Sequence, residues 1–289
     1  MSQDVAVGTE TPAVRTLAGF LRLVEIEAVD CQRYPTLVEQ LRTGAVHAIV
    51  IHQVYPEATL RRVVARLESH DPPFQQTWFP EAFRSFFYGR NLNLDEPSLP
   101  HYFADAHSFH QQLNELFAPD KSPQQHVADL IGQLDQSRAF RAAPGPNADD
   151  SYMFTTIRGH LEGGFIPAHC DNEQSLRPSY QHLATLVEGH IMSFVLSLGA
   201  PLQGGELQVY NHLYSPQATA AMNDDRTGLD VDPESLPSVR FRLPAGTMIL
   251  VDSGRYLHRV TPVGGVKKRW AMCSFFARSV DHQQLYCWG

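Results

Sequence analysis

Two histidines and one aspartate have the side-chain types and the spacing that bind a metal ion. His169 and Asp171 are two residues apart in residues 166–172. Alternate side chains of an extended chain lie on one face, so both side chains can reach one point. A third ligand, His258, follows far downstream. Two imidazoles and one carboxylate on one side of an octahedral metal form the facial arrangement used for iron(II), which leaves the opposite positions open.

A basic residue downstream of His258 adds an anion-binding group. Arg269 stands eleven residues after His258, and the intervening Thr261-Pro262-Val263-Gly264-Gly265 is typical of a turn. A hairpin at this turn would bring Arg269 back beside the strand that carries His258. A planar guanidinium in that place can hold a carboxylate with two hydrogen bonds.

Short strand-like segments dominate the chain after residue 150, and Gly or Pro separates most of them. They cover residues 152–159, 190–198, 205–211, 239–246, 247–253 and 269–277. Many short strands with turn signals between them predict an antiparallel sandwich or barrel.

The first half of the chain predicts helices. The apolar residues between Pro56 and Leu67 recur at helical spacing, and so do those between Tyr102 and Phe117 and those between residues 123 and 140. Residues 45–51 predict one buried strand, and residues 142–150 a linker. We therefore expect an α+β protein with a mainly β core braced by N-terminal helices. Residues 1–289 would form a single catalytic unit, with 16–150 mostly helical and 151–280 forming the β core.

Composition excludes several classes of partner. The 289 residues carry a net charge of −8, without a basic stripe, so nucleic acid and anionic membranes are poor partners. The N-terminus contains acidic and polar residues and no apolar run of membrane-spanning length. Four scattered cysteines without a Cys-x-x-Cys pair are typical of reduced thiols, so we expect a cytoplasmic protein.

Several motifs together resemble one enzyme superfamily. The His-x-Asp…His pattern, Gly204-Gly205-Glu206-Leu207, residues 243–263 and the strand that starts at Arg269-Trp270 are similar to the iron(II)/2-oxoglutarate-dependent oxygenases, in their prolyl-hydroxylase-like branch. The resemblance covers residues 150–280. It implies a double-stranded β-helix of the jelly-roll or cupin-like kind.

The resemblance also assigns roles to individual residues. His169, Asp171 and His258 would bind iron(II), and Arg269 would bind the distal carboxylate of 2-oxoglutarate, with O2 as the second co-substrate. Lys268 is an alternative anchor. Arg269 is favoured because Arg269-Trp270 aligns with the basic-aromatic start of the last core strand.

Asp171 bears on the type of reaction. Iron halogenases of this superfamily have a small residue at the position of the carboxylate, which leaves room for halide. The carboxylate therefore favours a dioxygenase that hydroxylates an unactivated C–H bond, or another two-electron oxidation such as desaturation or ring closure.

The sequence is compatible with three hypotheses about what the protein acts on or binds. We expect a small molecule, such as an amino acid or a natural-product intermediate, because no binding repeat or peptide-recognition module is present. A protein or peptidyl (prolyl-type) hydroxylase and a non-catalytic β-helix binding protein are the other hypotheses. Candidate substrate contacts are Thr156 and Arg158 on one predicted strand, and Asn172 and Glu173 after the predicted ligand.

Overall fold

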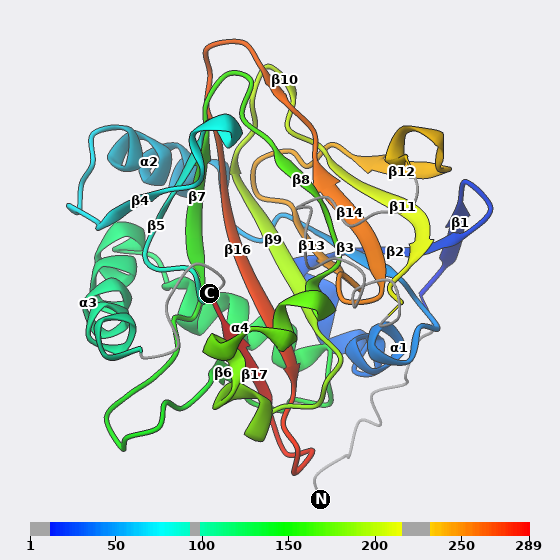
Figure 1. Cartoon of the computed structure of the whole chain (residues 1–289), viewed down its shortest axis with the longest axis horizontal. Helices are drawn as coiled ribbons and strands as arrows, with labels where there is room; N and C mark the ends of the chain where they lie inside the picture. The colour runs from blue at the N-terminus through cyan, green and yellow to red at the C-terminus, as the bar shows by residue number, and fades with distance from the viewer. Residues whose placement is uncertain (1–11, 93–98, 216–231) are drawn as a thin grey trace, which may run out of the picture.

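Two β-sheets face each other at the centre of the molecule (Figure 1). The structure is a computed structural model, and it describes all residues except 1–11, 93–98 and 216–231. The larger sheet has eleven strands. In sheet order they are β1 (Val14–Leu17), β2 (Leu21–Glu27), β3 (Ala48–His52), β13 (Met248–Val251), β9 (Met192–Gly199), β16 (Arg269–Arg278), β7 (Thr156–His160), β5 (Ser85–Tyr88) and β4 (Gln76–Trp78), with β17 (Leu285–Trp288) and β6 (Phe140–Ala142) extending it beside β16.

The smaller sheet is antiparallel throughout and has four strands. In sheet order they are β12 (Ser238–Phe241), β11 (Leu207–Leu213), β14 (Tyr256–Val260) and β8 (Ile166–His169). A short ladder of β10 (Gln203–Gly204) and β15 (Val263–Gly264) joins the connections at one end. This pair of facing sheets confirms the predicted α+β class with a mainly β core and the double-stranded β-helix.

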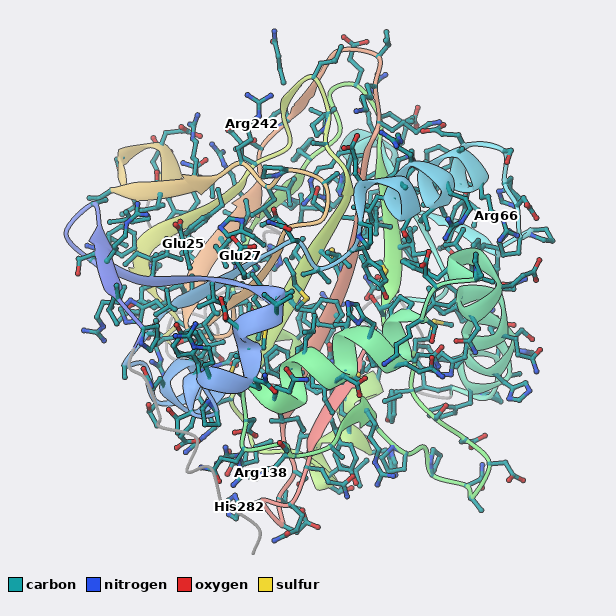
Figure 2. The ribbon with its side chains drawn as sticks, turned by 180° about the vertical axis from the view of Figure 1, so that it is seen from behind. Glu25, Glu27, Arg66, Arg138, Arg242 and His282 are labelled. Atoms are coloured by element: carbon teal, nitrogen blue, oxygen red, sulfur yellow. The ribbon has the colours of Figure 1, made fainter. Side chains whose placement is uncertain are left out.

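Four α-helices cover the outer face of the larger sheet, as Figure 2 shows from behind. They are α1 (Leu37–Thr43), α2 (Glu57–Glu68), α3 (Pro100–Phe117) and α4 (Pro123–Gln133). Short 3-10 helices complete the described elements: η1 (Ala28–Arg33), η2 (Glu81–Phe83), η4 (Asp171–Leu176), η5 (Pro178–Tyr180), η6 (Leu183–Thr185) and η7 (Pro233–Ser235).

Strand alternation divides the apolar side chains between two cores. On β3, Ile49 and Ile51 pack in the helix-side core, whereas Ala48 and Val50 pack in the core between the sheets. Successive side chains of a strand point to opposite faces, so one apolar strand serves both cores. The larger sheet is therefore the middle layer of the fold, packed against the helices on one face and against the smaller sheet on the other.

The predicted helices form, with one difference at an end. All five residues predicted for the apolar face of α3 are buried, from Tyr102 to Phe117. The helix predicted over residues 123–140 stops at Gln133, because Gln136 and Ser137 adopt positive φ angles of 56° and 60° and so leave the helical region.

The N-terminal part contributes more strands than the sequence analysis expected. Besides β3, where a strand was predicted, β2 pairs in parallel with β3, and β5 pairs with β7. These strands lie in the same sheet as β9, β13 and β16, which come from the second half of the chain. The division of the chain at residue 150 stays a prediction. Among the described residues, no helix is both long and apolar enough to span a bilayer.

Candidate metal centre

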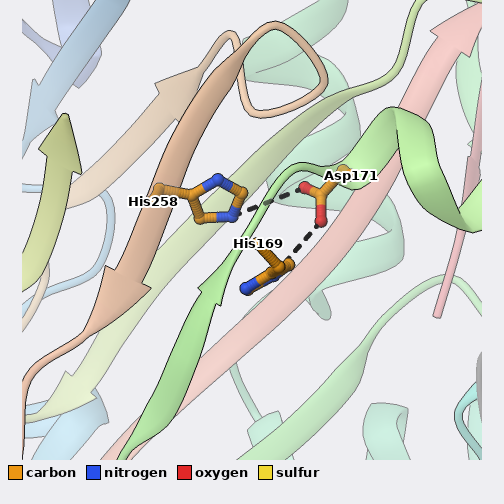
Figure 3. Close-up of side chains that lie close together, drawn as sticks. All are labelled: His169, Asp171 and His258. Carbon is orange, nitrogen blue, oxygen red and sulfur yellow. Dashed lines mark ion pairs between the residues drawn. The ribbon is translucent and has the colours of Figure 1, made fainter. Parts of the chain in front are cut away.

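The end of β8, the start of η4 and the middle of β14 bring His169, Asp171 and His258 together (Figure 3). His169 ends β8 and lies directly opposite His258 on β14 in the antiparallel register. Asp171 begins η4, and the extended Cys170 between them (φ −116°, ψ 135°) keeps the side chains of His169 and Asp171 on one face. Cys170 itself is 2% exposed and packs in an apolar cluster with Tyr210 and Leu257.

The three side chains surround one point. His169 Nε2 lies 3.4 Å from Asp171 Oδ1, and His258 Nε2 lies 3.7 Å from Asp171 Oδ2. One potential ligand atom of each residue lies within 4.8 Å of those of the other two. Octahedral metal–ligand bonds of about 2.0–2.2 Å place neighbouring ligand atoms about 3 Å apart, which is close to the separations of 3.4 and 3.7 Å.

Backbone carbonyls fix the orientation of both imidazoles. Nδ1 of His169 lies 2.8 Å from the carbonyl oxygen of Pro167, and Nδ1 of His258 lies 3.0 Å from that of Tyr256. A ring that donates Nδ1–H to a carbonyl presents the lone pair of Nε2 on its other side. Burial, followed by the charge of His169, lowers the pKa of His258 to about 4, so this ring is neutral and able to bind a metal.

The carboxylate of Asp171 is buried without a proper hydrogen bond. The residue is 1% exposed, and neither Oδ1 nor Oδ2 has a hydrogen-bond partner within the described part of the chain. A buried carboxylate without such partners is costly, and a cation bound between it and the two imidazoles would remove that cost. The donor set, its geometry and these orphaned oxygens fit a divalent iron ion.

The turn between β13 and β14 holds Asp171 in place. The carbonyl oxygen of Ser253 accepts a hydrogen bond of 2.9 Å from the backbone N–H of Asp171. The adjacent Asp252 is fully buried between His190 Nε2 at 2.9 Å and Arg255 Nη1 at 3.0 Å. This charged cluster anchors the turn. It was not predicted, because His190 is distant from Asp252 along the chain.

A small cavity of about 50 Å³ opens beside the three side chains. The inner face of the larger sheet forms its floor, with Val195, Cys273 and Phe275 among the lining residues, and Leu207 and Val260 line the smaller-sheet side. The lining is mostly apolar, which is typical of a site that excludes water around a few placed polar groups.

Arg269 lies in this cavity, but the predicted hairpin is wrong: β14 and β16 belong to different sheets, so Arg269 faces His258 across the space between the sheets. It is 6% exposed, and its guanidinium has no ion pair or hydrogen bond with any described residue. Burial lowers its pKa. Gly205 makes room for it, because a Cβ there would lie 2.8 Å from Cδ of Arg269. The neighbouring Lys268 instead forms an ion pair with Glu68 outside the cavity, which removes it as the alternative anchor.

His160 was not predicted to have a role, yet it lies beside Arg269. The two residues are cross-strand neighbours on β7 and β16. His160 is fully buried, its Nδ1 lies 2.7 Å from the Ser85 hydroxyl, and its Nε2 has no hydrogen-bond partner. Burial, followed by the charges of Arg269 and Arg158, lowers its pKa well below the usual value. Strand alternation would have found it, since it lies two residues after Arg158.

The four predicted substrate contacts do not come together. Arg158 lines the cavity, whereas Thr156, Asn172 and Glu173 do not. The Thr156 hydroxyl lies 3.4 Å from a carbonyl of β16, and Asn172 Oδ1 accepts a 3.0 Å hydrogen bond from a backbone N–H just before β9.

Comparisons with known proteins agree with this site. A family model described as carrier-protein-independent halogenase WelO5 matches residues 20–289. None of the curated proteins matches the sequence. An N-substituted L-amino acid dioxygenase from Burkholderia ambifaria, solved in complex with alpha-KG, has 12% identity and a TM-score of 0.55 over 87% of this chain and 90% of that chain. The 2-oxoglutarate-dependent epimerase SnoN from nogalamycin biosynthesis has 12% identity and a TM-score of 0.50 over 84% of this chain and 85% of that chain.

At these identities, the two solved structures show a shared fold. The family match spans most of the chain and includes all three residues of the candidate metal centre. The chain therefore belongs to the WelO5 family and is an oxygenase that depends on iron(II) and 2-oxoglutarate.

Proposed function

We propose that this protein hydroxylates an unactivated C–H bond of a small molecule, such as an amino acid or a natural-product intermediate. His169, Asp171 and His258 hold the iron, and Arg269 holds the distal carboxylate of 2-oxoglutarate. When bound, the metal with 2-oxoglutarate and dioxygen supplies the oxidising power to break the C–H bond.

The protein's own residues position the reactants. The two imidazoles and the carboxylate occupy one side of the metal and leave its other side facing the cavity. Arg269 offers a planar pair of donors whose charge is unpaired within the described structure. The apolar residues around the site exclude water, which strengthens these electrostatic contacts.

One observation carries the choice of hydroxylation over halogenation, and it is the carboxylate of Asp171. The family description names a halogenase, which makes halogenation the competing reaction. A halide would need the position on the metal that the carboxylate of Asp171 takes. This residue is buried between the two imidazoles, at 3.4 and 3.7 Å. The B. ambifaria dioxygenase supports an amino-acid-like substrate, by analogy of fold alone.

Chloride competition tests this proposal without knowledge of the substrate. Under argon, the visible absorption band of the iron(II)–2-oxoglutarate complex should not shift when chloride is added to the wild-type protein. With oxygen-18 gas and a pool of small acids, any product should gain labelled oxygen and show no chlorine isotope pattern, even at high chloride. A chloride-dependent band shift together with a chlorinated product would reject hydroxylation.

A further inference from the structure

Arg158 carries a charge that nothing in the described chain balances. It lies on β7, on the same face as His160, and lines the cavity with the metal-binding side chains and Arg269. Its Nε is buried without a hydrogen-bond partner, and among the described residues its guanidinium interacts with the ring of Phe79, whose centroid lies 6.0 Å from the guanidinium carbon, and forms no ion pair. A cation–π contact of this kind orients a guanidinium and leaves its N–H groups available.

A buried arginine outside the cavity, by contrast, forms ion pairs. Arg278 on β16 is 7% exposed and pairs with two carboxylates, Glu39 at 2.8 Å and Asp135 at 3.2 Å. Arg158 and Arg269 face the cavity and have no such carboxylate. Arg269 is buried and Arg158 is half-buried, with its Nε out of contact with water. A charge that is withdrawn from water without a partner destabilises a protein, so these two arginines at one cavity indicate ligands that bring anionic groups.

The charges of the bound co-substrate do not account for both arginines. The two positive charges of iron(II) balance the two negative charges of 2-oxoglutarate, and the negative charge of Asp171 balances the positive charge of Arg269. The positive charge of Arg158 then remains without a balancing negative charge. Opposite Arg158 on β16 stands Ala271, whose apolar side chain offers Arg158 no hydrogen bond or charge. One further anionic group beside Arg158 would make the loaded site neutral.

We propose that Arg158 binds a carboxylate of the substrate, so that the enzyme selects small organic acids. This inference rests on the proposed function and adds a substrate class to it. The guanidinium offers the planar pair of donors that a carboxylate matches. Arg158 thereby fixes which C–H bond of the acid faces the metal.

Matched acids and amides test this selection. The holoenzyme with iron(II) and 2-oxoglutarate is titrated under argon with a pool of N-acetyl-L-amino acids that have apolar side chains, and separately with the corresponding carboxamides. Binding is read from the shift of the visible band, and turnover from succinate released after oxygen is admitted. We expect only the acids to shift the band and to stimulate succinate. Arg158→Gln should weaken the acid response at least about tenfold, because a charge-assisted pair is lost.

Control variants separate the possible sources of an effect. Arg158→Lys, which keeps the charge, should retain part of the acid preference and also guards against a folding defect in Arg158→Gln. Arg141→Gln removes another arginine that stacks on an aromatic ring, Tyr286 at 5.5 Å, away from the cavity, and should change nothing. The affinity for 2-oxoglutarate should stay within about twofold in Arg158→Gln, because Arg269 remains.

Each other outcome overturns a defined part of the account. A wild-type protein that forms the band but responds equally to acids and amides, or to neither, rejects the acid-selecting role. A loss of 2-oxoglutarate affinity in Arg158→Gln, with the acid preference kept, assigns Arg158 to the co-substrate instead. A wild-type protein that forms no band and no succinate rejects the proposed function itself.

Discussion

Replacing Arg269 with glutamine should weaken 2-oxoglutarate binding by about 100-fold, because a buried charge-assisted pair of hydrogen bonds is lost. Arg269 is 6% exposed, lies in the metal cavity and has no partner among the described residues. The far carboxylate of the co-substrate would supply the missing charge. Glutamine keeps a polar side chain of related shape but loses the charge and the two-pronged donor geometry.

The magnitude follows from the burial of this arginine. A hydrogen bond to a charged group contributes about 1.5–3 kcal/mol, and truncating one partner of a buried charged pair costs about 2–5 kcal/mol. We take about 3 kcal/mol, which corresponds to about 100-fold in Kd. Without 2-oxoglutarate, the same substitution removes an unpaired buried charge, so the melting temperature of the free protein should stay equal or rise.

Lys268 provides the matched control, because it is the adjacent cation. Its ion pair with Glu68 is partly exposed, so Lys268→Gln should cost about 0–1 kcal/mol of stability and leave the Kd for 2-oxoglutarate unchanged. The assay is titration of 2-oxoglutarate into the anaerobic iron(II) protein, followed by the visible band and by the rise in melting temperature. An unchanged Kd in Arg269→Gln, or a loss in Lys268→Gln, would refute the assignment of the anchor.

Three further substitutions test other parts of the site and its support. Gly205→Ala should weaken 2-oxoglutarate binding about tenfold by displacing Arg269, whereas Gly19→Ala, also at positive φ but with open space around its Cβ, should lower only the melting temperature. Burial lowers the pKa of His110 to about 4 in the folded protein, where its ring accepts a backbone N–H. Between pH 7 and pH 5 this histidine therefore becomes protonated in the unfolded chain but not in the folded one, which should lower the free energy of unfolding by about 2 kcal/mol. Urea denaturation should show that this loss is smaller in His110→Gln, whose amide oxygen can still accept the bond. Asp171→Gly should open a position on the metal, so that added chloride shifts the visible band, as it should not in the wild-type protein.

The metal centre was the most predictable part of the site. His169 and Asp171 lie two residues apart in the chain, so extended geometry alone puts their side chains on one face. Arg269 was predicted to approach His258 through a hairpin, but the segment after His258 crosses from β14 in the smaller sheet to β16 in the larger one, so the two residues meet across the sheets. Long helices such as α3 were also predictable, because their apolar residues repeat over several turns.

Features that depend on contacts between distant segments were not predictable. Strand alternation places His160 on the face of Arg158, but its contacts with Ser85 on β5 and Arg269 on β16 depend on the pairing of distant strands, which local spacing does not predict. The predicted substrate role of Asn172 gained no support, because its side chain holds a backbone N–H near β9. β2 and β5 were missed since their short segments show their role only when they pair with β3 and β7.

Anaerobic iron binding tests the central claim most directly. Iron(II) and 2-oxoglutarate are added to the purified protein under argon, and bound metal and the visible band are measured for the wild type, His258→Ala and His101→Ala, an exposed histidine on α3. We predict one iron per chain and the band in the wild type and in His101→Ala, and loss of both in His258→Ala. A folded wild-type protein without bound iron or band, or a His258→Ala variant that keeps both, would contradict the account; the first result would favour a non-catalytic β-helix binding protein.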